Sequence, residues 1–179
     1  MDKKEIVQKK PILIILAGLP GTGKTTLARL LAKELSLVYL RVDCIEAPFC
    51  AAHMDVGAKG YQALIHVARE NLRLEHGVII DTVNPLHITR SMFLALAKEE
   101  HAKLIQFELK VKDVSLHQKR VEERKADIPG LDVPTWQDVR KREYDEWNEK
   151  IDGHATVVWM DNGELAFQKC LNVIHEFEK

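Results

Sequence analysis

A run of eight residues near the start of the chain has the types and spacing needed to bind phosphate. It reads Gly18, Leu19, Pro20, Gly21, Thr22, Gly23, Lys24 and Thr25, and it matches the phosphate-binding loop pattern G-x-x-x-x-G-K-[ST] in full. Glycines let successive backbone N–H groups point at phosphate oxygens, and the helix that follows adds its unpaired N–H groups and its positive end. Lys24 would then reach the β and γ phosphates of ATP, and Thr25 would offer its hydroxyl to Mg²⁺. The next residue, Thr26, completes the expected nucleotide-binding set.

The residues on either side of this loop supply the context that the motif requires. Residues 11–17 form an apolar run typical of a strand, and Leu27, Leu31 and Leu35 repeat on one face of a helix. A chance turn between a strand and a helix is the alternative interpretation, and these flanks argue against it. A dinucleotide site is excluded because the glycines read G-x-x-G-x-G rather than G-x-G-x-x-G.

Two aspartates follow later strands of the predicted fold. The run 37–42 ends at Asp43, and the run 78–80 ends at Asp81. The carboxyl ends of parallel strands meet at one edge of a sheet, so both carboxylates should lie near the phosphate loop. Asp43 is a candidate base for an acceptor hydroxyl, or else a cap for its strand. Asp81 is a candidate outer-shell ligand of Mg²⁺, or else a brace for the loop between strand and helix.

The remaining pattern alternates helices and strands, which predicts a doubly wound parallel α/β sheet in one domain, 1–179. Residues 44–59 suit an irregular segment or a short helix. A helix is predicted from Tyr61 to the terminating Gly77, and a second helix begins at Asn84 and Pro85 and runs to about residue 101. Residues 103–112 are predicted to form a strand with one more polar face. The last predicted elements are a helix from Thr135 to about residue 150, a strand at 155–160 and a helix at 164–179.

The segment 113–135 is predicted to form a lid. It joins a charged helix, 113–125, to a connector that contains Pro129, Gly130 and Pro134. Arg120 and Arg124 are four residues apart and can share a helix face, where they could neutralise charge on a transferring phosphoryl group. Arginine suits this task because its planar fork meets phosphate oxygens bidentately. The alternative is a solvent-exposed face whose arginines pair with neighbouring glutamates.

Aromatic residues are expected on one side of the helix that starts at Thr135. They are Trp136, Tyr144 and Trp147. They could stack on the base of a ligand, but their helical spacing favours packing in the core.

Composition places the chain among ordinary soluble globular proteins. Of its 179 residues, 46% are hydrophobic and 30% are charged, and the formal net charge is −1. A long nucleic acid is not an expected partner without a basic excess. No apolar run approaches the roughly 20 residues that span a bilayer, and no cleavage site follows the first strand, which predicts a cytoplasmic protein. Residues 1–10 are interpreted as a solvated arm, the three cysteines as reduced thiols, and the protein as a monomer or homodimer.

Other classes of phosphate-loop protein fit this sequence less well. A GTPase would carry D-x-x-G directly after a strand and the guanine-reading N-K-x-D, but the one D-x-x-G, at 127–130, follows a charged helix and N-K-x-D is absent. An AAA-type hydrolase would carry a water-activating Glu after the strand-three aspartate, where this chain has Thr82. A phosphotransferase and an ATP-binding hydrolase or switch protein stay open, with the former favoured.

The motifs together resemble a family. The loop at 18–25, "RVD" at 41–43, "VIIDTVNP" from Val78 and "HQKRVEERKADIPGLDVPTW" from His117 are similar to the small P-loop kinases often labelled AAA-type ATP-binding proteins. That group is related to polynucleotide 5′-hydroxyl kinases, zeta-toxin kinases, chloramphenicol phosphotransferase and gluconate kinase. The resemblance implies a three-layer sandwich with the sheet order 2-3-1-4-5 and a helical lid. It also implies ATP with Mg²⁺, an acceptor-side Asp43, a strand-three Asp81, and lid cations Arg120 and Arg124.

One departure from that family bears on the acceptor. Polynucleotide kinases have an arginine three residues after the acceptor-side aspartate to engage the substrate phosphate, and this chain has Glu46 there. The departure argues against nucleic-acid phosphorylation and favours a small-molecule acceptor with hydroxyls or a cationic group. We therefore expect transfer of the γ-phosphate of ATP to a hydroxyl, with the preference for ATP over GTP left open.

Overall fold

The sheet is built from five parallel strands. The computed structural model describes residues 10–178, with strands β1 (Ile12–Ala17), β2 (Val38–Arg41), β3 (Val78–Asp81), β4 (Lys103–Lys110) and β5 (Thr156–Trp159). They lie in the order β2-β3-β1-β4-β5, and each neighbouring pair is parallel. The predicted five-stranded sheet of order 2-3-1-4-5 is therefore confirmed. The expectation of a solvated arm falls on residues 1–10, of which residues 1–9 lie outside the described residues.

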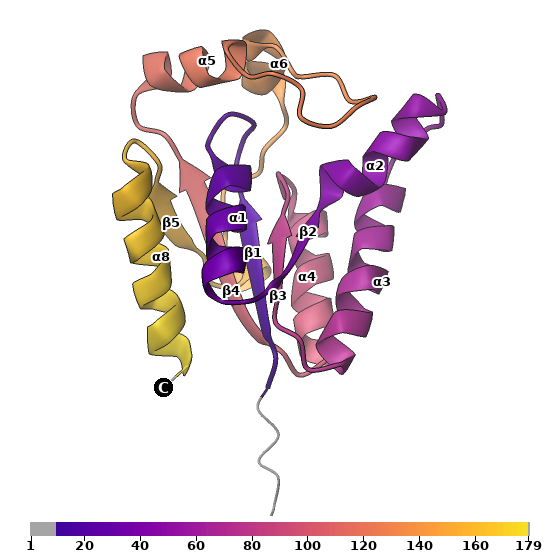
Figure 1. Cartoon of the computed structure of the whole chain (residues 1–179), viewed down its shortest axis with the longest axis vertical. Coiled ribbons are helices and arrows are strands. Elements are labelled where there is room, and N and C mark those ends of the chain that lie inside the picture. The colour runs from indigo at the N-terminus through magenta and orange to yellow at the C-terminus, as the bar shows by residue number, and fades with distance from the viewer. Residues whose placement is uncertain (1–9, 179) are drawn as a thin grey trace, which may run out of the picture.

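Helices connect the strands and cover both faces of the sheet (Figure 1). They are α1 (Lys24–Glu34), α2 (Val42–Ala51), α3 (Lys59–Arg73), α4 (His87–Glu99), α5 (Val114–Glu122), α6 (Trp136–Lys141), α7 (Glu149–Asp152) and α8 (Gly163–Glu178). None of the described helices is long and apolar enough to cross a membrane.

The sheet separates two hydrophobic cores, because alternate side chains of a strand point to opposite faces. Ile14 and Leu16 of β1 pack in the core beneath α1 and α8. Leu13 and Ile15 pack in the core beneath α3 and α4. Burial on both faces explains why β1 reads as an unbroken apolar run, and it confirms the predicted three-layer sandwich.

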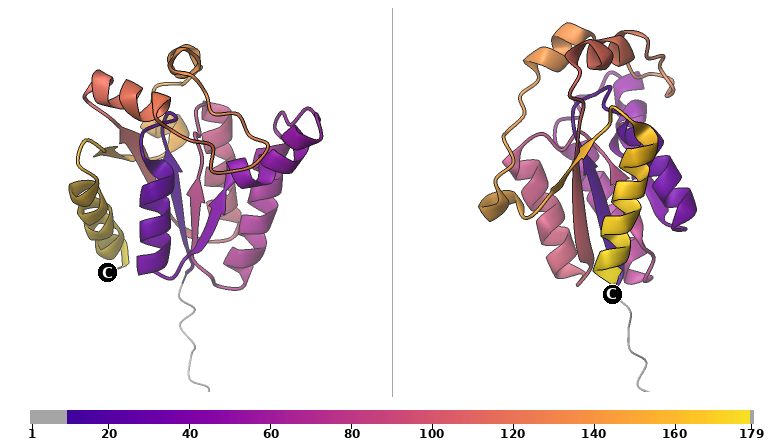
Figure 2. Two further views of the ribbon diagram at one scale, coloured as in Figure 1. Left: turned by 45° about the horizontal axis from the view of Figure 1, so that its top comes forward. Right: turned by 90° about the vertical axis from the view of Figure 1, so that its left-hand side faces the viewer.

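The predicted lid segment lies above the carboxyl ends of the strands. In both views of Figure 2, α5, the loop after it and α6 run across the end of the sheet where the phosphate loop emerges. Helices α5 and α6 also contact each other. The segment is thus placed over the edge at which a doubly wound sheet binds ligands.

Several predicted boundaries were wrong around β2 and β3. Strand β2 ends at Arg41, so Asp43 lies in the first turn of α2 rather than at the end of a strand. Helix α4 begins at His87 and not at Pro85, because Asn84 has a left-handed backbone with φ of 46°. Gly77 does not end α3 in a left-handed conformation; that backbone occurs at Glu75, where φ is 62°.

The predicted helix from Thr135 to residue 150 was also wrong beyond its first turns. Thr135 and Asp138 do form the expected capping box, and α6 then ends at Lys141. Tyr144 and Trp147 therefore do not continue a helical stripe with Trp136. Instead both rings lie beside the buried Arg90 guanidinium, 5.2 and 4.3 Å from it, while Trp136 packs edge-on against His117.

The polar face predicted for the fourth strand is not exposed. Gln106 and Glu108 of β4 are each only 2% exposed. Gln106 donates to the Asp152 and His154 carbonyls, and Glu108 pairs with Lys110 at 2.9 Å. The segment at 142–153 covers this face, which sequence spacing alone does not reveal.

Candidate active site

The phosphate loop has the curled backbone that its glycines permit. Gly21 and Gly23 have φ of 81° and 94°, a region that residues with side chains rarely adopt. A Cβ at Gly21 would also lie 2.5 Å from the Val121 side chain of α5. The lid helix therefore rests directly on the loop, and His117 of the same helix contacts the Pro20 carbonyl oxygen at 2.8 Å.

Lys24 is a buried cation beside this loop. Its residue is 7% exposed, and its ammonium donates to the Leu19 carbonyl at 2.9 Å. Burial lowers the pKa of Lys24 to about 8, against the opposing influence of Asp81 and Asp43. In the described part of the chain no carboxylate lies within ion-pair distance of it. The ammonium thus keeps donors free for an anion, as the motif predicts.

Asp43 lines the same cavity and is oriented by Arg41. The Arg41 guanidinium donates to one Asp43 oxygen through two nitrogens, at 2.7 and 3.1 Å. It also donates to Asp127 of the lid connector at 2.7 Å. The Asp43 side chain stays 37% exposed, so it can reach a ligand while Arg41 holds its position.

Asp81 ends β3 beneath the loop. It is 3% exposed and accepts a hydrogen bond from the Tyr39 hydroxyl at 3.0 Å. Arg41 lies 3.8 Å away. One Asp81 oxygen is therefore engaged by the protein, while the residue still lines the cavity with Thr25.

Thr25 and Asp81 are a suitable donor set for a nucleotide-held Mg²⁺. Both offer oxygen, the donor that this hard cation prefers, and both line one cavity. Among residues 10–178, no three or more His, Cys, Asp or Glu side chains are grouped closely enough to hold a metal ion. The residues therefore fit an ion whose remaining ligands are phosphates and water.

The two predicted lid arginines do not act together in this structure. Arg120 lies on α5 and donates to the Met160 carbonyl at 2.9 Å, away from the cavity. Arg124 lies beyond the end of α5, lines the cavity and is 3.9 Å from Asp127. The expectation of a shared helix face was wrong because α5 ends at Glu122, before Arg124.

Sequence reasoning missed a third arginine, Arg142. It follows α6, lines the cavity and is among the cations whose charge lowers the pKa of Lys24, as is Arg124. Arg142 therefore stands within electrostatic reach of the phosphate loop. No spacing rule could have found it, because the predicted helix ran through this position and the observed backbone turns there.

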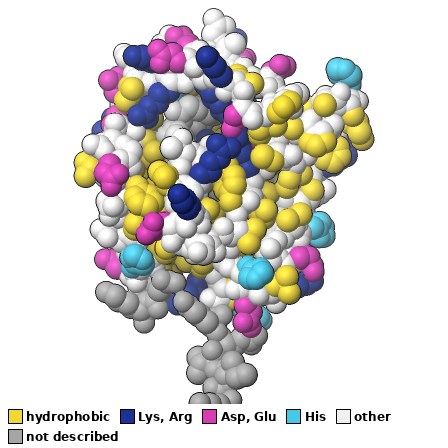
Figure 3. All heavy atoms as spheres, in the orientation of Figure 1, with side chains coloured by type: hydrophobic (Ala, Val, Ile, Leu, Met, Phe, Trp, Pro, Cys, Tyr) yellow, Lys and Arg dark blue, Asp and Glu magenta, His cyan; other side chains and the backbone are white. Residues whose placement is uncertain are grey.

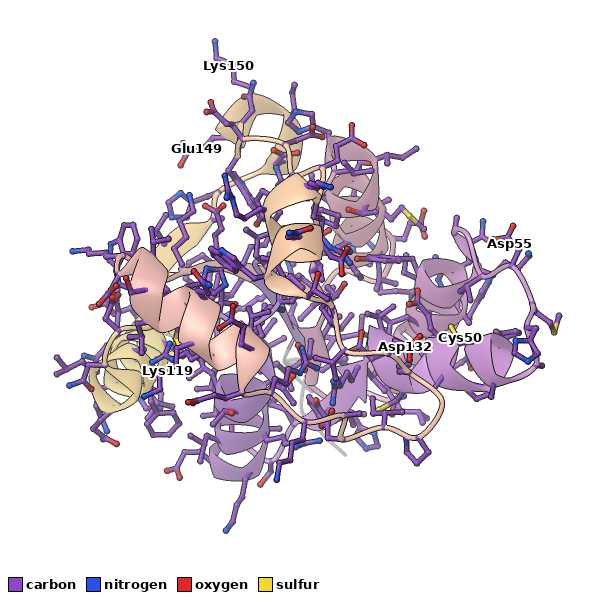
Figure 4. The ribbon with its side chains drawn as sticks, turned by 90° about the horizontal axis from the view of Figure 1, so that it is seen from above. Cys50, Asp55, Lys119, Asp132, Glu149 and Lys150 are labelled. Carbon is purple, nitrogen blue, oxygen red and sulfur yellow. The ribbon has the colours of Figure 1, made fainter. Side chains whose placement is uncertain are left out.

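The cavity that unites these groups has a volume of about 720 Å³. Figure 3 shows Lys and Arg side chains gathered in the upper half of one face, with hydrophobic side chains beside them over α2 and α3. Seen from above in Figure 4, the lid connector with Asp132 runs close to the α2 segment that carries Cys50. The phosphate loop, α2, the start of α3, the loop before α4 and the lid connector all contribute walls.

Much of the remaining lining of the cavity is apolar. It includes Val42, Tyr61, Leu86, Ile88, Met92, Ile128, Leu131 and Val133. The hydroxyl of Tyr61 is already engaged, since it accepts from Thr82 at 2.6 Å and from the Asn84 amide at 3.1 Å. The cavity thus combines charged side chains of both signs with apolar side chains from α2, α3, α4 and the connector.

Comparison with known proteins agrees with this geometry. The sequence profile of the AAA domain matches residues 13–146. The chain belongs to that family. The predicted kinship with small P-loop kinases is confirmed. A probable adenylyl-sulfate kinase of Aeropyrum pernix is 31% identical over 111 residues, which cover 57% of this chain and 60% of that protein. The match thus spans less than two thirds of the length of this curated relative.

Solved structures share the fold across nearly the whole chain. Kti12 of Chaetomium thermophilum, in complex with ADP-AlF3, superposes with a TM-score of 0.69 at 23% identity and covers 93% of this chain and 99% of its own. The APS kinase CysC of Mycobacterium tuberculosis, in complex with AMPPNP and APS, gives 0.68 at 17% identity, covering 93% and 98%. These likenesses confirm the P-loop fold.

Proposed function

We propose that this protein transfers the γ-phosphate of ATP to a hydroxyl group of a small molecule. The observation that carries the proposal is one cavity with the phosphate-loop Lys24 at one end and the exposed, oriented carboxylate of Asp43 on its wall. A kinase of the same fold, the APS kinase in complex with AMPPNP and APS, supports the same activity. A bound nucleotide at the loop and an acceptor beside Asp43 would share this cavity.

The reaction divides between these residues. Asp43 takes the proton of the acceptor hydroxyl while the hydroxyl oxygen forms a bond to the γ-phosphorus. The bond between that phosphorus and the β–γ bridging oxygen breaks, and ADP leaves. Lys24 stabilises the phosphates throughout, and Mg²⁺ bound with Thr25 and Asp81 would neutralise charge on them.

The lid supplies further positive charge. Arg124 and Arg142 face the cavity and fit the role of cations for the transferring phosphoryl group. Arg120, which was expected to share this role, is engaged by the Met160 carbonyl. It would have to leave that bond to reach phosphate, so we assign the role to Arg124 and Arg142.

The alternative is an ATP-binding hydrolase or switch without an acceptor. The apolar lining of the cavity argues against this hydrolase alternative. A hydrolase needs only water as acceptor, whereas a small organic acceptor would bind against apolar side chains. We further propose that this protein is cytoplasmic, consists of a single domain and acts as a monomer or homodimer.

The decisive experiment compares phosphate release with labelling of acceptors from γ-labelled ATP in wild type and in Asp43→Asn. We expect Asp43→Asn to bind ATP almost normally and to lose transfer by about 10²- to 10⁴-fold, the usual share of general base catalysis. Robust hydrolysis without stimulation by any acceptor, unchanged in Asp43→Asn, would overturn the kinase proposal.

A further inference from the structure

Glu46 is a carboxylate without a partner in the wall of the cavity. It lines the cavity and is half-buried, yet no hydrogen bond or ion pair within the described residues satisfies it. Burial raises the pKa of Glu46, and the charge of nearby Asp43 raises it further. Its side-chain oxygens are not fully buried, so a molecule bound in the cavity can reach them.

The position of this carboxylate is set by the packing of α2 on α3. Glu46 lies against Gly60, where a Cβ would come within 2.5 Å of the Glu46 Cγ atom. Gly60 is itself buried, and α2 and α3 are in extensive contact. The absence of a side chain at Gly60 leaves the space that the Glu46 side chain occupies, and its carboxylate lies over the first turn of α3 in the lining of the cavity.

Glu46 stands one helical turn from Asp43 on α2. Residues three apart on a helix have Cβ atoms about 5 to 6 Å apart on the same face. A molecule that presents a hydroxyl to Asp43 would therefore place an atom a few bonds away beside Glu46. That atom meets a carboxylate, which favours a positively charged nitrogen.

Neither of the protein's own cations near Glu46 forms an ion pair with it within the described residues. Arg41 is engaged by Asp43 and Asp127. Arg142 is the one cation whose charge lowers the pKa of Glu46, but the two form no ion pair. Arg142 also acts on Lys24 at the phosphate loop, where a bound triphosphate would attract it.

The surroundings of Glu46 suit an organic cation. Tyr61 lies in the same wall, and the Glu46 charge is felt at its hydroxyl. Aromatic rings attract cations, and a carboxylate beside a ring is a typical environment for an amine. Ile88 and Met92 continue this wall as an apolar surface for the body of the molecule.

We infer that Glu46 binds a protonated amine of the acceptor, and that the acceptors are amino alcohols with an apolar body whose hydroxyl and nitrogen are separated by a few bonds. The inference rests on the proposed function. It deepens that proposal by giving Glu46 the role of a residue that determines specificity, distinct from the base Asp43.

The test uses pairs of acceptors that differ only in charge. N-benzylethanolamine is compared with its neutral ether analogue, ethylene glycol monobenzyl ether, within a panel of such pairs. Their affinities are measured by calorimetry with the full chain, Mg²⁺ and a non-hydrolysable ATP analogue, in wild type and in Glu46→Gln. Asp55→Asn is the matched control, because Asp55 is an exposed carboxylate in the loop after α2 and lies at the outer edge of the molecule in Figure 4.

We expect the wild type and Asp55→Asn to bind the amines at least about 10-fold more tightly than the ethers, which is the usual contribution of a hydrogen bond to a charged group. Glu46→Gln should lose that preference. Binding of the ATP analogue by Glu46→Gln shows that the variant is folded. Equal affinity for both series in the wild type, including no measurable binding of either, overturns the inference, as does an unchanged preference in Glu46→Gln.

Labelling of the same acceptors separates the two proposals. Transfer to ethers as fast as to amines would leave the kinase function standing and overturn the role of Glu46. Glu46-dependent binding of amines that are never phosphorylated, together with ATP hydrolysis that no acceptor stimulates, would support the binding role of Glu46 and overturn the kinase function.

Discussion

Two buried cations of this protein, Lys24 and Arg90, have opposite surroundings. Arg90 is fully buried behind the loop that precedes α4. Its five N–H groups donate to the carbonyls of Asn84, Pro85, Asp145 and Glu146 and to the Asp152 carboxylate. Lys24 is almost as buried, but its ammonium has a single hydrogen bond, to a carbonyl.

The difference distinguishes a structural charge from a binding charge. Arg90 uses every donor that a guanidinium has and ties α4 to α7 and the segment before it. Lys24 keeps donors free at the cost of a pKa lowered to about 8. A buried charge with unsatisfied donors destabilises the protein unless a ligand completes it, so Lys24 marks the site that binds phosphate.

Breaking the Arg90 pair should have the largest effect on stability. Asp152→Asn removes the charge that balances Arg90 and that also holds His87 at 2.8 Å. We expect the free energy of unfolding to fall by about 3 to 5 kcal/mol, the usual result of leaving a buried charge unpaired, with ATP affinity unchanged. Urea denaturation and calorimetry measure the two effects.

A matched variant on the same helix sharpens this prediction. Glu149 of α7 pairs with His154 at the surface, where both side chains are 69% exposed. Glu149→Gln should change stability by less than about 1 kcal/mol. Equal destabilisation by Asp152→Asn and Glu149→Gln would show that burial does not distinguish these pairs.

Removing the binding cation should affect ligand affinity. Lys24→Ala should weaken ATP binding by about 10- to 150-fold, or 1.5 to 3 kcal/mol, and should abolish transfer. Lys119→Ala is the control, because Lys119 lies on the lid with a 67% exposed side chain. Unchanged ATP affinity in a folded Lys24→Ala protein would remove Lys24 from the phosphate site.

The lowered pKa of Lys24 predicts a pH dependence. Below about pH 8 the ammonium is already protonated and binds phosphate fully. Above that pH the free protein must take up a proton on binding, so ATP affinity should fall by up to about tenfold per pH unit. Calorimetry in buffers of different ionisation enthalpy would detect the proton uptake. Affinity that is constant between about pH 7 and about pH 9 would contradict the prediction.

The smallest effect on stability is expected at the rim of the cavity. Asp127 accepts from Arg41 and lies 3.3 Å from Arg29, but its side chain is 38% exposed. Asp127→Asn should therefore change the free energy of unfolding by less than about 1 kcal/mol. The same denaturation measurement checks it, and a loss as large as that of Asp152→Asn would erase the distinction between rim and interior.

Much of this molecule could be predicted from sequence because its signals are local. The phosphate loop depends on consecutive residues, from Gly18 to Thr25, and on the strand and helix beside them. The strands were recognised because β1 and β3 are buried on both faces and read as apolar runs. The sheet order came from the family resemblance and not from periodicity.

The tertiary structure alone decided the long-range contacts. Arg142 reaches the cavity and Arg120 does not because α6 ends at Lys141 and because α5 rests against the Met160 carbonyl. Gln106 and Glu108 are buried although their strand alternates, since Gln106 donates to the Asp152 carbonyl and Tyr144 lies near Glu108. Local sequence determines which elements form and where the loop curls, but the partners of a charged side chain lie tens of residues away, and packing alone brings them together.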